Sequence, residues 1–422
     1  MNNSELVDEM VQRLGVEIKG LLTDSQAGGV AVGAIELLVR EKLWHLGAQA
    51  MGVLLEARDA ALVAGRSVHD RPTRTVVTLF GAVDVTRSRC VDGRYPLDEA
   101  LGLHGQQGWT VSVQEAVSLL GCETGFQTVS DLMRRLLGLR ISRTRAEKVA
   151  EQAGQRAAEV LESSPAPPEH DASGKAWVVA TDGCQAPERD GWHEVKVATV
   201  YTSESRAKTA CGRRKLLRKA YLASLDPASA WGQRLRQAAQ AWRVEKAKRV
   251  VVMGDGAPWI WNLADEHFPG AVEIVDYYHA VEHLWAAGEA LFGDRERSAA
   301  TQGWVRHNRR QLRRGRADLV IASIQRGQAR PGLCGERAAI VRRNLEYFRT
   351  NQQRMRYDQY RRWRLPIGTG AVEGSCKFVV QSRFKKPGAR WSDLGLRQML
   401  ALKLARLNGQ WETLWPHLRL TA

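Results

Sequence analysis

Two carboxylates occupy the same place in two similar segments of the sequence. Asp182 ends the segment AWVVATD, Asp255 ends RVVVMGD, and a glycine follows each aspartate. Apolar runs of this length predict buried strands, and side chains at strand ends gather at one edge of an open α/β sheet, where active sites form. Aspartate before glycine is also common turn chemistry, so either residue alone fits a structural turn. The pair, together with the later segment GTGAVEG, favours an active site built on carboxylates.

A second candidate is the segment DYYHAVEH, in which His279 and His283 lie one helical turn apart with Glu282 between them. The glutamate is displaced from its place in HExxH, which disfavours a zinc protease. The six cysteines lie far apart and contain no CxxC pair. This spacing disfavours a disulfide framework and a zinc knuckle, and it fits the reducing cytoplasm.

The elements that must position these residues alternate between strand and helix. HEVKVATVY (193–201) and VEIVD (272–276) predict further strands, and helices are expected at about 228–246, in PWIWNLADEHF and in YYHAVEHLWAAGEALF. This alternation is typical of an α/β fold. Further towards the N-terminus, residues 29–64 predict a long amphipathic helix, and RTVVTLFGAVDVTRSR predicts a β-hairpin around Gly81.

Residues 126–152 have the pattern of a helix-turn-helix. One helix, TVSDLMRRLLG, is followed by the turn GLRIS, in which Ser142 caps a second helix. Arg143 and Arg145 stand near the start of that second helix, where a recognition helix contacts base edges and phosphates. A plain helical hairpin fits the same pattern, so both interpretations stay open.

The distribution of charge indicates a polyanionic partner. The chain has a net charge of +16. Residues 295–364 hold nineteen arginines, five acidic residues and no lysine, a net charge of +14 in one sixth of the chain. Arginine without lysine favours phosphate contact through bidentate forks, although a solvated helical face is the alternative. The residues of this segment for which we predict DNA contact are Arg309, Arg310, Arg313 and Arg314.

The composition is that of a folded protein, with 44% hydrophobic and 26% charged residues. The apolar stretches are too short to span a bilayer, and the first residues have no secretory pattern, so we expect a cytoplasmic protein with no membrane partner. The Pro- and Ser-rich stretch 163–175 predicts a linker. The predicted segments are 1–107 (N-terminal helices and hairpin), 108–162 (helix-turn-helix region), 163–175, 176–294 (first part of the core), 295–365 (Arg-rich helical insertion) and 366–422 (final part of the core).

Three segments resemble bacterial insertion-sequence transposases of the Kra type, which are relatives of Mutator-like elements: TDGCQ, GDGAPWIWNLADEHFPGAVEIVDYYHAVEHLW and LPIGTGAVEGSCKFVVQSRFKKPGARW. The resemblance covers about residues 75–420. It implies a DDE-type, RNase H-like catalytic core that follows the α-helical N-terminal region. In that family the first acid lies on the first strand, the second follows the fourth strand, and the third lies on a helix beyond a helical insertion. These roles fall on Asp182, Asp255 and Glu373.

The chemistry implied is metal-dependent cleavage of phosphodiesters. Two Mg²⁺ or Mn²⁺ ions about 3.5–4 Å apart stabilise the attacking and leaving oxygens, and carboxylates are suitable ligands. The catalytic acids Asp182, Asp255 and Glu373 are therefore also the expected metal ligands. The resemblance places Asp276 and His279 near the active site; relatives carry Cys-x-x-His there, so the role of His279 stays open between function and packing.

Basic residues after Glu373 are candidates for a phosphate grip. Lys377 follows it by four residues and is expected on the same helix face. The other three candidates are Arg383, Lys385 and Lys386. Family members often carry a cysteine pair at the end of the hairpin, but Cys90 has no second cysteine nearby, so we predict no zinc.

The expected function is that of a DNA transposase, which binds the ends of its insertion sequence and performs strand cleavage and strand transfer. The expected partners are double-stranded terminal repeats and target DNA, and pairing two DNA ends requires at least a homodimer. Two alternatives stay open: a domesticated DNA-binding protein without catalysis, and an RNase H-like structure-selective nuclease.

Overall fold

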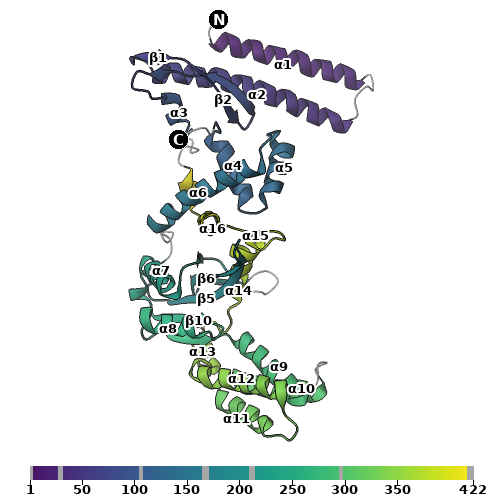
Figure 1. Ribbon diagram of the computed structural model, residues 1–422, viewed down its shortest axis with the longest axis vertical. Coiled ribbons are helices and arrows are strands. Elements are labelled where there is room, and N and C mark those ends of the chain that lie inside the picture. The colour runs from purple at the N-terminus through teal and green to yellow at the C-terminus, as the bar shows by residue number, and fades with distance from the viewer. Residues whose placement is uncertain are drawn as a thin grey trace. The chain divides into compact units, whose positions relative to one another are not determined.

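The computed structural model describes residues 3–26, 32–103, 108–163, 171–208, 214–293 and 298–415 (Figure 1). The chain forms two compact units. Unit 1 is Met1–Ala153 with Glu412–Ala422, and unit 2 is Gly154–Trp411. The finer division into six segments stays a prediction. No helix in the described part of the chain is both long enough and apolar enough to cross a bilayer.

Unit 1 begins with two long helices, followed by small antiparallel strand pairs and a helical region (Figure 1). The predicted helix 29–64 and the predicted hairpin around Gly81 are confirmed as α2 and β2–β3. The elements are α1 (Asn3–Gln26), α2 (Val32–Leu62), β1 (Val68–Asp70), β2 (Thr73–Thr78), β3 (Gly81–Thr86), β4 (Arg89–Cys90), α3 (Pro96–Ala100), α4 (Val111–Gly121), α5 (Phe126–Leu137) and α6 (Arg143–Ser163), the last of which continues into unit 2.

The hairpin of unit 1 packs its apolar face against α2. Leu55 of α2 shares a buried cluster with Val76 and Val85, which alternate inward along β2 and β3. Side chains on one face of a strand recur at every second position, so this pattern determines which face of the hairpin packs against α2.

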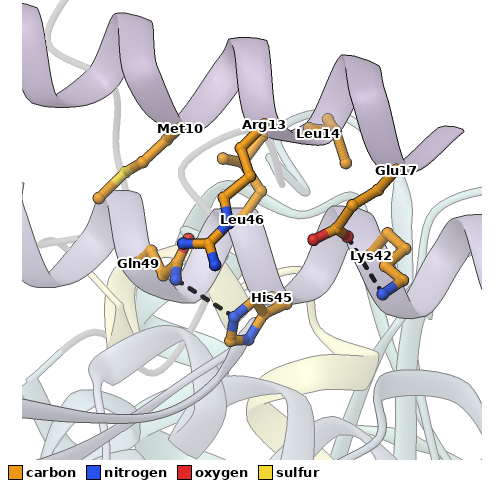
Figure 2. A pocket seen from close by; sticks show the side chains of 8 residues that line it. All are labelled: Met10, Arg13, Leu14, Glu17, Lys42, His45, Leu46 and Gln49. Atoms are coloured by element: carbon orange, nitrogen blue, oxygen red, sulfur yellow. Dashed lines mark hydrogen bonds and ion pairs between the residues drawn. The ribbon is translucent and has the colours of Figure 1, made fainter. Parts of the chain in front are cut away.

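A small pocket of about 200 Å³ lies between α1 and α2. Figure 2 shows Glu17 of α1 reaching across it to Lys42 of α2, and the two charged groups lie 3.1 Å apart. His45 and Gln49, one turn apart on α2, are in hydrogen-bond contact. The Glu17–Lys42 ion pair joins the two helices, and none of the predicted site residues lines this pocket.

The region 126–152 forms two helices with a short turn, as predicted. Helix α5 ends at Gly138, whose left-handed φ of 67° closes the helix. Ser142 accepts a hydrogen bond from the Arg145 backbone N–H at 3.3 Å, which confirms it as the cap of α6. Arg143 and Arg145 are exposed in the first turn, and the Arg145 guanidinium lies 5.0 Å from the ring centroid of Trp109.

Unit 2 is built around a five-stranded mixed sheet with the order β11-β10-β5-β6-β9. The pairs β9–β6 and β6–β5 are antiparallel, and the pairs β5–β10 and β10–β11 are parallel. The strands of unit 2 are β5 (Ala176–Pro187), β6 (Trp192–Thr202), β7 (Arg206–Lys208), β8 (Arg214–Leu216), β9 (Ala220–Ser224), β10 (Arg249–Gly254) and β11 (Val272–Val275). This sheet, flanked by helices, confirms the α/β class.

The helices of unit 2 fall into those that flank the sheet and those of the insertion. The first group is α7 (Ala228–Ala241), η1 (Val244–Lys246), α8 (Pro258–His267), α9 (Tyr277–Phe292), α14 (Gly370–Ser375), the π-helical segment η3 (Cys376–Gln381), α15 (Ser382–Phe384) and α16 (Asp393–Leu407), with η4 (Trp411–Leu414) at the unit boundary. The insertion holds α10 (Ala299–Arg313), α11 (Ala317–Gln328), α12 (Gly335–Asn351), η2 (Gln352–Arg354) and α13 (Tyr357–Arg362), so its predicted helical character is confirmed.

The helices α10 and α12 pack against α9, and α11 packs against both α10 and α12 (Figure 1). Apolar residues such as Val305, Leu312 and Phe348 are buried among them, while the arginines of α10 stay on the surface. The predicted linker is only partly described: α6 reaches Ser163, residues 164–170 lie outside the described part, and Asp171 accepts two hydrogen bonds from Ser173 in a turn.

The prediction that the first buried strand ends at Asp182 is wrong. Strand β5 continues to Pro187, and Asp182 pairs with Val197 of β6 in the middle of an unbroken antiparallel ladder. Gly183 is part of the regular strand, where it pairs with Lys196. The Glu194 side chain lies against it, at the place where a Cβ on Gly183 would be. The glycine therefore allows a close approach between strands, whereas the Asp-Gly dipeptide suggested a turn.

Candidate active site

Asp182 and Asp255 lie side by side because of the register between β5 and β10. These parallel strands pair Ala180 with Met253, and each aspartate lies two residues beyond that pair. A step of two residues preserves the face of a strand, and neighbouring strands lie about 4.8 Å apart. Asp255 is the residue after the end of β10, and its charge acts on the Asp182 carboxyl, so the two carboxylates lie close together.

The electrostatics of Asp182 agree with this arrangement. Burial raises the pKa of the Asp182 carboxyl, and the nearby charge of Asp255 raises it further. The Gly183 backbone N–H donates to Asp182 Oδ1 at 2.7 Å, and this bond, the Cys376 thiol and the charge of His279 act in the opposite direction. Two acids that repel each other at a partly buried edge form a site that a cation would stabilise.

A tight turn and a residue of the helical insertion hold Asp255. Its Oδ1 accepts a hydrogen bond from the Ala257 N–H at 2.9 Å, and its backbone carbonyl accepts one from the Tyr347 hydroxyl at 2.8 Å. Gly256 has φ 116°, and a Cβ there would lie 2.7 Å from the Tyr347 ring. Tyr347 in turn stacks on His283 with ring centroids 3.6 Å apart.

Asp276 follows the next strand, β11, and acts as a structural anchor. Its side chain is 1% exposed and caps α9 by accepting from the backbone N–H groups of Tyr278 (2.6 Å) and His279 (3.4 Å). It also accepts from the Thr369 N–H at 2.8 Å and from the Thr369 hydroxyl. With its oxygens engaged in this way, Asp276 ties the loop before α14 to the end of the sheet.

Glu373 lies on α14 and is exposed at the site. The Thr369 hydroxyl, which contacts Asp276, also lies 3.3 Å from Glu373 Oε1. Helix α14 is fixed to β6 by Thr199, whose hydroxyl contacts the Ser375 hydroxyl. Cys376, three residues beyond Glu373, lies with its Sγ 3.8 Å from Asp182 Oδ2. This contact places the end of the helix that bears Glu373 beside Asp182.

The three acids fit Mg²⁺ or Mn²⁺ by donor type, because hard divalent cations prefer carboxylate oxygens. They are more widely spaced than a single ion requires. In the described part of the chain, the one group of three such side chains with ligand atoms all within 4.8 Å of one another is Glu188, Asp190 and His193, at the turn between β5 and β6. A pair of ions would suit the wider spacing of the acids.

The four arginines of the insertion for which we predicted DNA contact all lie on the surface. Arg310, Arg313 and Arg314 are exposed at the end of α10. Arg309, on the same helix, is exposed and donates to the Tyr277 hydroxyl at 3.3 Å. In residues 298–364, no ion pair with a carboxylate involves these four arginines. Their charge is therefore available to an anion.

Among the basic residues after Glu373, one prediction is wrong. Arg383 is 3% exposed, and its guanidinium lies 4.8 Å from the Trp391 ring centroid, so it packs inside the protein and not against a phosphate. Lys377 is exposed, but it lies in the π-helical segment, where the four-residue face rule of an α-helix does not hold. Lys385 and Lys386 are half-buried, and the Lys385 ammonium lies 5.4 Å from the exposed ring of Trp192.

Comparison with known proteins decides the family. A model of the uncharacterised protein family UPF0236 matches residues 26–415. The chain belongs to the UPF0236 family. A curated relative, "UPF0236 protein in vanSb 3'region" of Streptococcus gallolyticus, is 23% identical over 366 residues, which are 83% of this chain and 76% of the relative. The assignment to Kra-type transposases is therefore wrong: the match is to UPF0236, and neither finding indicates a transposase of the Kra or Mutator type.

Sequence reasoning missed several residues of the candidate site. Tyr347, Tyr357 and Tyr360 of the insertion donate their hydroxyls to the backbone carbonyls of Asp255, Val275 and Glu273, respectively. Thr369 joins Asp276 to Glu373. These residues act through tertiary contacts more than 80 positions away in the case of the tyrosines, so no local pattern marks them.

A buried pair of cysteines also adjoins the candidate site. Cys184 follows Asp182 by two residues on the same strand, and its thiol is in hydrogen-bond contact with Cys376. That contact, burial and the nearby Asp182 carboxylate raise the pKa of the Cys376 thiol. A thiol that keeps its proton donates to Asp182 and does not compete as a thiolate ligand. The wide spacing of the cysteines in the sequence concealed this pair.

Proposed function

We propose that this UPF0236 protein is a DNA transposase that cleaves and joins DNA strands with the help of two divalent cations. The observation that carries the proposal is the register between β5 and β10, which brings Asp182 and Asp255 side by side, next to the helix that bears Glu373. Three carboxylates from a central strand, a strand end and a helix form a site suited to two-ion phosphodiester chemistry. The UPF0236 match neither supports nor opposes this activity, because that family is uncharacterised.

The same proposal includes an RNase H-like core. The sheet has three consecutive antiparallel strands followed by two parallel ones, in the order β9-β6-β5-β10-β11. Asp182 lies on the first of these strands in the chain, Asp255 follows the fourth, and Glu373 follows a helical insertion. This is the pattern expected of an RNase H-like enzyme with an insertion before its third acid.

In this proposal, Asp182, Asp255 and Glu373 bind the cations. Bound Mg²⁺ or Mn²⁺ would supply charge stabilisation at the attacking and leaving oxygens and a more acidic water. Asp276 and Thr369 position the loop before the helix that bears Glu373, and Tyr347 holds the backbone at Asp255. His279, whose charge favours the ionised form of Asp182, would keep that carboxylate ready to bind a cation.

The arginines of the insertion are the proposed contacts with the DNA backbone. Helix α10 packs on α9, and α9 begins at Asp276 beside the acids, so the basic face belongs to a helical body fixed to the site. Guanidinium groups bind phosphate oxygens in pairs and stay charged at all relevant pH values. Arg143 and Arg145 of unit 1 would provide a second, independent contact with DNA ends.

The catalytic part of the proposal is tested by incubating the purified full-length protein with supercoiled plasmid and DNA bearing the ends of its element, with and without Mg²⁺. We expect Mg²⁺-dependent nicking and strand joining. Asp255→Asn should lower the rate by more than about 100-fold, because loss of an outer-shell partner alone costs about 10–100-fold.

The matched control is Asp265→Asn, since Asp265 is an exposed acid on the neighbouring helix α8, ten residues away from Asp255. This variant should cleave at the wild-type rate. Unchanged cleavage by Asp255→Asn would refute the catalytic assignment. Cleavage without strand joining would show a nuclease instead of a transposase.

The DNA-contact part is tested by the salt dependence of duplex binding, measured by fluorescence anisotropy. The logarithm of affinity should fall with the logarithm of salt concentration by about 0.9 per phosphate contacted. Replacing Arg310, Arg313 and Arg314 with alanine should reduce that slope by as much as about 3. Arg236→Ala, an exposed arginine on α7, is the control and should leave the slope unchanged. An equal slope in the triple variant and the wild type would remove the insertion from the DNA contact.

A further inference from the structure

A cavity of about 700 Å³ opens beside Glu373. Its volume lies within the roughly 300–1,000 Å³ of ordinary ligand sites. Its lining includes Glu373, Gly374 and Gly368, and also Tyr201 and Lys219. The cavity therefore reaches from a proposed catalytic carboxylate to a cationic side chain.

Two aromatic side chains in this cavity are unusually exposed. Tyr278 of α9 and Phe378 of η3 are each 59% exposed, although both lie next to buried parts of the core. Exposure of a large ring costs hydrophobic free energy that packing would recover, so two such rings in one cavity indicate a surface that binds something flat and apolar.

The backbone holds these rings in place. A Cβ on Gly368 would lie 2.6 Å from Tyr278 Cε2, so the glycine allows the tyrosine ring to lie against the loop. Tyr278 also contacts the Tyr277 ring edge-on, with centroids 5.5 Å apart, and its backbone N–H is fixed by Asp276. Phe378 stands in the π-helical segment directly after the helix that carries Glu373. Both rings are thus connected to residues of the active site.

We propose that this cavity binds one unpaired nucleobase of the DNA strand whose phosphate lies at Glu373. The inference rests on the proposed function and adds a specific subsite to it. Aromatic faces stack on any base, and a neighbouring cation binds the phosphate that the base leaves exposed. Lys219, half-buried in the same cavity, provides that cation. A base taken out of the stack would open the DNA at the position of cleavage.

The experiment uses the full-length protein without divalent cations, so that no cleavage occurs. One probe is a fully paired duplex, and the other is the same duplex with a short single-stranded overhang that contains 2-aminopurine. Stacking on Tyr278 or Phe378 should quench the 2-aminopurine fluorescence. The wild type should also bind the overhang duplex more tightly than the paired one, and the double variant Tyr278→Ala/Phe378→Ala should reduce that preference by roughly 5- to 150-fold, the effect of losing one stacking surface.

Aromatic replacement separates stacking from general structure. Tyr278→Phe and Phe378→Tyr keep a ring and should retain the quenching, whereas the alanine variants should lose it. Leu394→Ala, which removes an equally exposed apolar side chain of α16, should behave as the wild type. Circular dichroism should show the same thermal transition for all variants, because the replaced rings are largely exposed.

The outcomes distinguish the inference from the proposed function. Binding of the paired duplex without quenching of the overhang base would overturn the inference and leave the DNA-binding function intact. Quenching that survives in the double alanine variant would overturn it as well. Failure to bind either DNA would refute the proposed function itself.

Discussion

The Asp-Gly pairs at Asp182 and Asp255 are identical as dipeptides and different as structures. Asp182 and Gly183 lie in the middle of β5, inside an antiparallel ladder, while Asp255 and Gly256 form the turn after β10. In the first pair the glycine admits the Glu194 side chain, and in the second it provides a backbone angle that other residues rarely adopt. The same sequence signal thus has two physical causes.

This difference comes from where the neighbouring strands stop pairing with β5 and with β10. Beyond Asp182, β6 continues to pair with β5 as far as Pro187, so the chain has hydrogen-bond partners and no reason to turn. Beyond Gly254, β10 has no further partner in the sheet, and Asp255 accepts a bond from Ala257 to form the turn. The neighbours end at different places, so the aspartates are adjacent although their backbones differ.

The largest effect that follows from this comparison is expected at Gly256. Gly256→Ala must place a side chain at φ 116° and 2.7 Å from the Tyr347 ring. Strain of this kind costs about 1–3 kcal/mol, and the steric conflict adds to it. The variant should therefore unfold at a lower urea concentration than the wild type. Its free energy of unfolding, measured by urea titration, should be about 3 kcal/mol lower. A loss below about 0.5 kcal/mol would show that the turn is not as constrained as we describe.

A smaller effect is expected at Gly183, and it depends on one neighbour. Gly183→Ala must displace the end of the Glu194 side chain, which is held by an ion pair with Lys196 at 2.9 Å, and should cost about 1 kcal/mol. In a Glu194→Ala background the same substitution should stabilise the protein by about 0.4–1 kcal/mol, because alanine restricts the unfolded chain. The same loss of stability in both backgrounds would contradict the close approach of Glu194.

The smallest effect concerns the repulsion between the two acids. Because the pKa of Asp182 is raised in the folded protein, its ionised form destabilises the fold at neutral pH, and this penalty disappears as pH falls through the raised pKa towards the ordinary value of 3.8. Without divalent cations, Asp182→Asn should raise Tm by roughly 2–4 °C at pH 7, the shift that about 1 kcal/mol gives in a domain of about this size.

The gain from Asp182→Asn should shrink as the pH approaches 4, and calorimetry in EDTA measures it at each pH. With saturating Mg²⁺ the order should reverse, because the wild type is stabilised by ion binding and the variant is not. An Asp182→Asn protein that is less stable than the wild type in EDTA at neutral pH would mean that the carboxylate is not under repulsion.

Part of the site could be predicted from the sequence alone. Apolar, β-branched runs identify β5 and β10, and helical periodicity identifies α2. Asp255 follows its strand as expected, and Ser142 caps α6 as expected. These features depend on residues close together in the chain, where side-chain pattern and capping chemistry decide the structure.

Other features could not be predicted, because they depend on contacts between distant residues. Arg383 lies close in the sequence to the basic residues Lys385 and Lys386, yet its guanidinium packs against the ring of Trp391. As a carboxylate after a strand, Asp276 could be a metal ligand, yet it accepts a hydrogen bond from the Thr369 backbone N–H, 93 positions later in the chain. In the sequence, the helix with Glu373 is like many other helices that follow a glycine-rich turn. Only the contact between Cys376 and Asp182 in the structure places it at the site.

The sequence by itself determined the main strands β5, β6, β10 and β11, where positive charge accumulates, and that two aspartates follow similar apolar runs. The tertiary structure alone decided that those aspartates are neighbours, since their proximity comes from the pairing of Ala180 with Met253. It also decided where β5 ends and which basic residues stay exposed. The physical reason is that strand register and burial are chosen by the whole sheet, through hydrogen bonds and packing that no single segment contains.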